Sequence, residues 1–244
     1  MKTIKQYMLV SLGLLSLVLT PTACTSEVPN PSTQQGEFSI SLTAADIHTE
    51  LQTRTSISGV DINNFYVSLN DAEGISFMEN KQFATITGAN CILPAATGYE
   101  LLVESCTESE ATTLNNGFGA YRFVGSATFD IVAGEITPVA VNCVLQNAGL
   151  QIEFDESFTA KFPIYAVTTQ DTRALVFNSD NQGIAAYYDV PDELVLSLRI
   201  TGSSGGWDDR LDIIREVELN KGKITKILVT YSVESGSRIK LDTL

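Results

Sequence analysis

Histidine and tryptophan are almost absent from this chain of 244 residues, which contains only His48 and Trp207. Zinc sites need several His or Cys ligands at short spacing, and the four cysteines do not have such spacing. No glycine-rich phosphate-binding motif occurs. His48 stands in a polar stretch without evident triad partners, so we interpret it as a solvated loop residue. We therefore expect no metal, no cofactor and no enzyme activity.

Positive charge is also scarce. The chain has 15 Lys and Arg residues against 29 Asp and Glu residues, a formal net charge of −14. Phosphate backbones and anionic lipid surfaces repel such a chain. The charge balance therefore argues against nucleic-acid binding, and against any membrane contact made through basic side chains.

Only one long apolar run occurs, from Met8 to Leu19. It follows a short basic start and precedes Ala23 and Cys24, which is the layout of a bacterial export signal. The run is shorter than the ~20 residues that span a bilayer. We interpret residues 1–23 as a signal peptide and Cys24 as a lipidated first mature residue, because acyl chains anchor proteins to membranes. The alternative is an ordinary secretory signal, with Cys24 a free or disulfide-bonded cysteine.

Three cysteines follow Cys24, and an exported chain meets an oxidising compartment. Because three is odd, at most one intramolecular bridge can form among them. We expect Cys106–Cys143, since these residues lie late in two predicted strands. The alternative is that Cys91, Cys106 and Cys143 are buried thiols acting as small hydrophobes.

The remainder of the chain predicts an all-β fold. Residues 24–35 combine Cys24 with a polar, proline-containing tether. Beyond them, apolar and polar residues alternate with a period of two, as expected for strands with one buried face. These runs begin at Phe38, Phe65, Tyr99, Ala127, Val139, Leu150, Leu194, Val217 and Ile227. The only short helix candidates are Ala44 to Gln52 and Asp208 to Glu216, and the second is equally compatible with a strand.

An internal sequence repeat predicts two tandem domains. Residues 131–141 and 219–229 both read as strand, Gly turn, Ile-Thr and apolar strand, at a spacing of 88 residues. We interpret each as the closing hairpin of its own β-sandwich, although any Gly-turn hairpin selects similar residues. The predicted boundaries are 36–147 for the N-terminal sandwich and 148–244 for the C-terminal sandwich. A short link predicts that the two pack end to end.

The segment around Trp207 is the best sequence candidate for ligand contact. Trp207, Asp208 and Asp209 follow Ser203-Ser204-Gly205-Gly206, which reads as a loop. An exposed aromatic residue on such a loop can stack on a sugar or hold a partner. The alternatives are a tryptophan folded over the domain end and, for the two aspartates, calcium binding. Paired carboxylates elsewhere arise by chance in a chain with 29 acids.

Several segments together resemble a known group of proteins. They are Cys24 after its leader, Ile92-Leu93-Pro94-Ala95-Ala96-Thr97-Gly98-Tyr99-Glu100-Leu101, residues 121–131 and residues 141–150. The chain is similar to Bacteroidota lipoproteins with two immunoglobulin- or transthyretin-like sandwiches. These include fimbrial anchor and accessory subunits, and related domains of unknown function. The family's strand entry reads Leu-Pro-Ala-Gly-x-Tyr, and here Ala96-Thr97 interrupts the position of the expected glycine.

This resemblance implies an outer-membrane lipoprotein without an active site, at the cell surface or on the periplasmic face. Its expected role is structural or adhesive, including fimbria-like assembly; the alternative is a glycan- or ligand-binding surface lipoprotein. Protein partners would bind by strand addition to an exposed sheet edge. The expected edges are residues 36–43 and Ile239–Leu241.

Overall fold

The computed structural model describes residues 34–44, 60–205, 210–232 and 238–243. Its strands are β1 Gln35–Ala44, β2 Tyr66–Asn70, β3 Ser76–Gln82, β4 Ile92–Pro94, β5 Ala96–Glu104, β6 Phe123–Ile131, β7 Ile136–Leu145, β8 Ala148–Phe154, β9 Ile164–Thr169, β10 Val176–Phe177, β11 Ala185–Tyr188, β12 Glu193–Ser203, β13 Arg210–Asn220, β14 Ile224–Ser232 and β15 Arg238–Thr243. Its helices are the short α1 Glu110–Thr113 and α2 Glu156–Lys161, with 3₁₀ turns at Ile62–Asn64, Phe83–Thr85, Gly88–Asn90 and Asn115–Gly117. The expected all-β class is confirmed.

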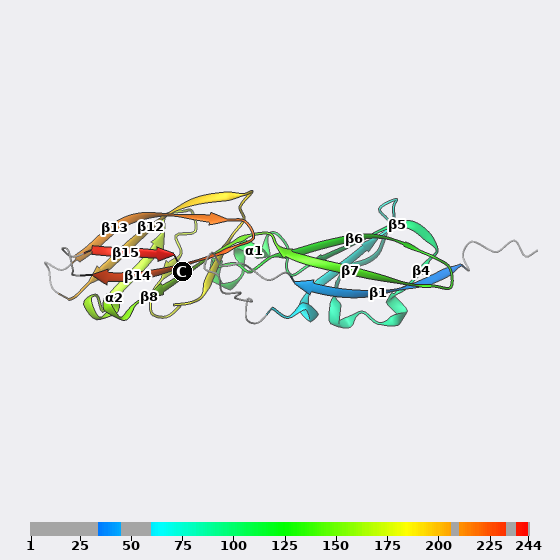
Figure 1. Cartoon of the computed structure of the whole chain (residues 1–244), viewed down its shortest axis with the longest axis horizontal. Coiled ribbons are helices and arrows are strands. Elements are labelled where there is room, and N and C mark those ends of the chain that lie inside the picture. Colours follow the sequence, from blue (N-terminus) through cyan, green and yellow to red (C-terminus); the bar gives the residue numbers. More distant parts are fainter. Residues whose placement is uncertain (1–33, 45–59, 206–209, 233–237, 244) are drawn as a thin grey trace, which may run out of the picture.

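The strands form three sheets. A seven-stranded sheet has the order β3-β2-β5-β6-β7-β1-β4 and contains every described strand before residue 148. The later strands form two four-stranded sheets, β10-β9-β12-β13 and β11-β8-β14-β15. The first sheet occupies one end of an elongated molecule and the other two occupy the opposite end (Figure 1). We call these parts the N-terminal half and the C-terminal half, divided between residues 147 and 148.

Each half has its own core, built by the alternation expected from the sequence. Side chains at every second position of β2, β5 and β7 are buried in the first core, and those of β8, β12 and β14 in the second. Val67, Val103 and Cys143 in the first core, and Leu198 and Val229 in the second, are fully inaccessible. Burying one such aliphatic side chain stabilises a fold by about 1.5–3 kcal/mol relative to exposure.

The sequence repeat at residues 131–141 and 219–229 corresponds to a repeated structural arrangement. The first strand of each half runs parallel to its last long strand: β1 pairs with β7 and β8 with β14. At the two connections, Gly134 and Gly222 have φ of 78° and 75°, a region that favours glycine.

The same hydrogen bond also occurs in both connections. The Thr137 hydroxyl donates to the Asp130 carbonyl at 3.1 Å, and the Thr225 hydroxyl donates to the Glu218 carbonyl at 3.4 Å. These positions are again 88 residues apart.

These connections are not the simple hairpins that were expected. β6 and β7 pair only at Phe123–Leu145 and Val124–Val144, far from the turn that joins them. β13 and β14 belong to different sheets. After the turn, β7 therefore pairs mainly with β1, the first strand of the N-terminal half. β14 likewise pairs with β8, the first strand of the C-terminal half. Sequence periodicity describes the faces of a strand and cannot reveal this choice of neighbour.

Asp208 to Glu216, ambiguous in sequence, forms a strand over its described part. β13 begins at Arg210 and pairs with β12 along its whole length. The Arg199 guanidinium on β12 donates to both carboxylate oxygens of Asp212 on β13, at 2.8 and 2.6 Å. The other helix candidate lies outside the described residues except for Ala44, which ends β1.

The two cores meet in an interlocked junction. Tyr187 of β11 packs in the first core and is only 7% exposed. In return, Phe118 packs against the second core, with its ring 5.2 Å from that of Phe177. The Tyr187 amide donates to the Phe118 carbonyl at 2.7 Å. Buried Asn147 accepts from the Arg122 amide and donates to the Ala120 carbonyl, so its side chain replaces backbone pairing where the halves join.

Candidate binding surfaces

Four residues singled out in the sequence lie outside the described residues: Cys24, Trp207, Asp208 and Asp209. The same holds for His48. The flanks of the 206–209 segment are described. β12 ends at Ser203 and β13 begins at Arg210, at the end of the molecule opposite the start of β1 (Figure 1).

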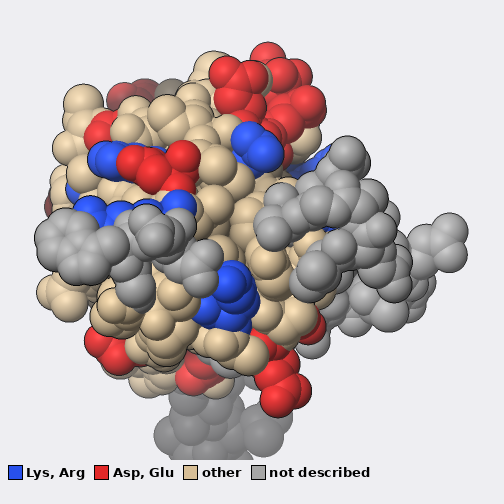
Figure 2. Space-filling model, turned by 90° about the vertical axis from the view of Figure 1, so that its left-hand side faces the viewer, with Lys and Arg blue, Asp and Glu red and all other residues tan. Residues whose placement is uncertain are grey.

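A shallow hollow of about 330 Å³ lies at this tip of the C-terminal half. Its lining residues are Ile164, Tyr165, Ala166, Thr201, Gly202, Ser203, Arg210, Leu211 and Asp212. Ile164 is 70% exposed, which makes it an unusually open apolar side chain. Lys, Arg, Asp and Glu side chains are interspersed on this end of the molecule (Figure 2). The tip therefore combines mixed charge with a small apolar patch, and its lining includes Ser203 and Arg210, the ends of β12 and β13.

Cys106 and Cys143 are not joined in the structure, where all three described cysteines are free and buried. Cys143 lies on β7 inside the first core, whereas the Cys106 thiol donates to the Tyr121 carbonyl at 3.4 Å. β6 separates β5 from β7, and strands two positions apart lie about 10 Å apart, whereas a disulfide needs Cα atoms within about 7 Å. Burial raises the pKa of Cys143 to about 11. This geometry is that of the buried-thiol alternative.

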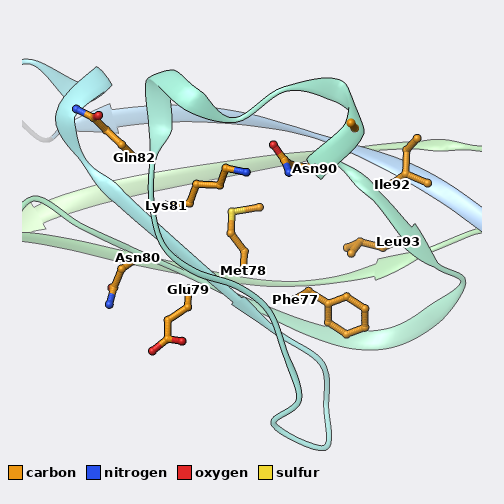
Figure 3. A pocket seen from close by; sticks show the side chains of 10 residues that line it. Phe77, Met78, Glu79, Asn80, Lys81, Gln82, Asn90, Ile92 and Leu93 are labelled. Atoms are coloured by element: carbon orange, nitrogen blue, oxygen red, sulfur yellow. The ribbon is translucent and has the colours of Figure 1, made fainter.

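A cavity of about 600 Å³ lies between β3 and β4 in the N-terminal half (Figure 3). Its lining residues are Phe77, Met78, Glu79, Asn80, Lys81, Gln82, Ala89, Asn90, Ile92 and Leu93. These two strands are the outermost members of the seven-stranded sheet, so both ends of that sheet border one space. We call this space the β3–β4 groove.

A bulge in β3 determines how Lys81 faces the groove. Val67 pairs with Lys81 and Leu69 pairs with Met78, so two residues of β3 stand opposite one residue of β2. Asn80 supplies the irregular backbone with φ of 45°, and its amide donates to the Ser68 hydroxyl at 3.1 Å. The extra residue places Lys81 on the same face as Val67 and Met78, although strict alternation from Met78 would point it outward.

Sequence reasoning missed this groove because the bulge breaks the alternation by which strands are recognised. One signal was nevertheless present: Lys81 is the only Lys or Arg between Arg54 and Arg122. Residues 34–44 and 60–147 carry two cations and 11 carboxylates, whereas the described part of the C-terminal half carries ten cations and 12 carboxylates. Arg122 is paired with Glu104, so Lys81 is the one cation of the described N-terminal half without a carboxylate partner.

The two edges proposed for strand addition differ in the structure. β1 pairs with β7 along its whole length from Glu37, but β4 pairs with residues 35–37 alone and the Phe38 amide donates to the Cys91 carbonyl. One side of residues 39–43 therefore has no partner strand in the described part of the chain. Ile239–Leu241 lies in β15, which is the outer strand of its sheet. A cavity of about 360 Å³ lies between β15 and β13 and is lined by Glu216 and Glu218.

One acidic residue at the end of a strand has a structural role. Asp155 caps α2, where its side chain accepts from the Ser157 amide at 2.8 Å. Hydrogen bonds from Ser157 lower the pKa of this carboxyl. No group of three His, Cys, Asp or Glu side chains that could hold a metal ion occurs in the described residues. No described helix has the length and apolar content to cross a membrane.

This all-β architecture is similar to several solved structures. A candidate cell adhesion protein from Bacteroides ovatus has a TM-score of 0.49 at 10% identity, over 84% of this chain and 95% of that chain. A fimbrial assembly protein from Parabacteroides distasonis has a TM-score of 0.44 at 14% identity, over 85% and 100%. A candidate cell adhesion protein from Bacteroides eggerthii has a TM-score of 0.44 at 12% identity, over 86% and 95%.

The chain itself belongs to the family described as the domain of unknown function DUF4493, whose model matches residues 34–241. No curated protein matches the chain. Domains of unknown function and Bacteroidota adhesion or fimbrial proteins, the two groups that the sequence resembles, are thus both among the proteins to which this chain is similar.

Proposed function

We propose that this chain is a lipid-anchored protein of the outer membrane with a structural or adhesive role and no catalytic activity. The observation that carries the proposal is the placement of the two ends. The described chain starts at one end of the long axis, and the hollow beside residues 206–209 lies at the other (Figure 1). A chain anchored through Cys24 would therefore present this tip away from the membrane.

The elongated shape supports this role. Each half has a separate core, and we infer that each is an immunoglobulin- or transthyretin-like sandwich, residues 36–147 and 148–244. The junction residues Tyr187, Phe118 and Asn147 hold the two cores in line. A rigid rod made of two cores is suited to displaying a binding surface, and a flexible chain would not hold that surface at a fixed distance.

Metabolic labelling with palmitate tests the anchor. We expect label on the natural chain and none on Cys24→Ser, with the Cys106→Ser variant as a matched cysteine control that retains label. Protease treatment of intact cells then distinguishes the cell surface from the periplasmic face. Labelling that persists in Cys24→Ser would contradict lipidation at this residue.

Partner binding by strand addition is proposed at β15, the outer strand whose edge is open in the described structure. A partner segment pairing there would protect alternate amides of β15 from hydrogen exchange. Protection scattered over both halves, or confined to β10, would contradict this mode. β10 serves as the internal control because it is also an outer strand but is only two residues long.

Glycan contact at the tip is the second candidate, favoured by the hollow beside residues 206–209 and by its open apolar lining residue Ile164. We expect a glycan that binds there to lose affinity in Trp207→Ala and to retain it in Tyr66→Ala. Tyr66 is a suitable control because it is an exposed aromatic residue in the other half, with 41% of its surface accessible. Equal affinity in both variants would remove Trp207 from the site.

A further inference from the structure

The β3–β4 groove contains a positive charge that no carboxylate of the described N-terminal half neutralises by an ion pair. Lys81 is half-buried and is turned toward the groove by the β3 bulge. Figure 3 shows its side chain extending across the groove toward Asn90, whereas Glu79 and Asn80 point away. An ammonium group partly removed from water and without a carboxylate partner is most stable when an anion joins it.

The lining also provides an uncharged group with free hydrogen-bonding capacity. The Asn90 Oδ1 atom is occupied by the Thr87 amide and hydroxyl, both at 3.3 Å, which leaves its Nδ2 donors for a ligand. Gln82, the residue after Lys81, pairs with Tyr66 on the opposite face of β3 and donates to Asn64 at 2.9 Å, so its side chain does not join Lys81 and Asn90. A ligand hydroxyl can accept a hydrogen bond from the Asn90 donors.

Apolar surface borders the same groove. The Phe77 side chain is 43% exposed and that of Ile92 is 50% exposed, although both belong to the lining. An exposed aromatic ring can stack on the apolar face of a sugar ring. The volume of about 600 Å³ falls within the range of about 300–1,000 Å³ typical of ligand pockets.

The strands that flank the groove are poor sites for an added peptide strand. β3 has a bulge and an inward-pointing lysine, which are two devices that protect sheet edges from pairing. β4 is only three residues long and ends at Pro94, which has no amide proton. Recognition in the groove therefore falls to side chains, and a ligand rich in hydroxyl groups fits them better than a polypeptide backbone does.

The field of the N-terminal half limits the charge of the ligand. The described N-terminal half carries 11 carboxylates and two cations, so its net negative charge would repel a polyanion that approached the groove. One carboxylate next to Lys81 avoids most of this repulsion. We propose that the β3–β4 groove binds a lightly charged glycan through one uronic-acid residue, whose carboxylate pairs with Lys81 and whose hydroxyls bind Asn90.

This inference rests on the proposed adhesive role but concerns a separate surface from the tip. Calorimetry on the chain without residues 1–23 tests it, with xylotriose carrying one glucuronic acid as the probe. The methyl ester of that carboxyl is the matched control, since it removes the charge and keeps the sugar. We expect the acid to bind about tenfold or more tightly than the ester, because a charge-assisted hydrogen bond is lost.

Variants assign the effect to Lys81. Lys81→Met should bring the acid to the affinity of the ester, and Lys81→Arg should restore most of the difference. Lys221→Met, which removes an exposed lysine from the C-terminal half, should leave both affinities unchanged. An unchanged thermal transition in Lys81→Met shows that the variant is folded.

Three results would overturn the proposal: no binding of the acid at millimolar concentration, equal affinity for acid and ester, or an acidic peptide that binds as tightly as the sugar. Each of these would leave the proposed adhesive role untouched, because palmitate labelling and the hydrogen exchange of β15 are measured separately. Loss of palmitate label in Cys24→Ser together with intact uronate binding would support both the anchor and the groove.

Discussion

Tyr187 offers the sharpest test of how the two cores are joined. Its backbone belongs to β11 in the C-terminal half, whereas its side chain is 7% exposed in the core of the N-terminal half. Its ring also meets that of Tyr121 edge-on, with centroids 6.2 Å apart. Tyr187→Ala should therefore remove contacts that bridge the halves, and not merely contacts within one of them.

The magnitude follows from the size of the buried ring. Replacing a buried large aromatic side chain by alanine costs about 3–5 kcal/mol of unfolding free energy. For a chain of this length each kcal/mol shifts Tm by roughly 2–4 °C, so Tyr187→Ala should lower Tm by roughly 6–20 °C. Tyr187→Phe keeps the ring and should lose much less. Tyr66→Ala removes an exposed ring and should stay within about 0.5 kcal/mol of the natural chain.

Differential scanning calorimetry on the chain without residues 1–23 is the appropriate assay. One transition is expected for the natural protein, with calorimetric and van't Hoff enthalpies that agree. In Tyr187→Ala the whole transition should move, or split into two transitions that both lie below the original. A split in which one transition keeps the original Tm would show that Tyr187 does not couple the cores.

Three further predictions follow from burial. Cys143, whose pKa burial raises to about 11, should resist a thiol reagent at pH 8 in the folded chain and react within minutes in denaturant; rapid native reaction would contradict the structure. Burial raises the pKa of Tyr188 to about 12, so the folded state holds this proton more tightly than the unfolded state. The contribution of Tyr188 to stability should thus be complete below pH ~10 and should be lost between pH ~10 and ~12, by about 2–3 kcal/mol, and a flat pH profile of denaturant midpoints would exclude this. Gly125→Val should destabilise by about 1–3 kcal/mol, because a Cβ there would lie 2.8 Å from the Asn142 carbonyl oxygen, whereas Gly88→Ala, with open space around it, should be neutral in the same melts.

The sequence predicts most of the strands well because one face of each is buried. The alternation that begins at Phe38, Tyr99 and Leu150 corresponds to β1, β5 and β8, and the inward positions are those that the alternation marks. β3 was not predicted because its bulge at Asn80 shifts the alternation of inward and outward side chains by one residue. β11 was not predicted because its residues do not alternate between buried and exposed. Ala186 and Tyr188 are buried in the core of their own half, and Tyr187 between them is buried in the core of the other half.

Pairing was harder to predict than strand position. Residues 131–141 and 219–229 were correctly recognised as equivalent, yet both were interpreted as hairpins, whereas each connection instead leads to a strand parallel to the first strand of its half. Local sequence encodes the turn at Gly134 or Gly222 but not the distant partner. The β3–β4 groove was unpredictable for the same reason, since it exists only because residues 77–82 and 89–93 are brought together by the sheet.

The parallel pairing of β1 with β7 also has a consequence for how the molecule is made. Glu37 pairs with Ile136, about a hundred residues later in the chain. β1 therefore cannot pair with β7 until nearly all of the N-terminal half has left the ribosome or the translocation pore. Long-range closure of this kind is slow and leaves an apolar edge available to other chains in the meantime. A chaperone that covers unpaired strand edges of the newly made chain should therefore increase the yield of folded protein more than it changes the stability of the folded state.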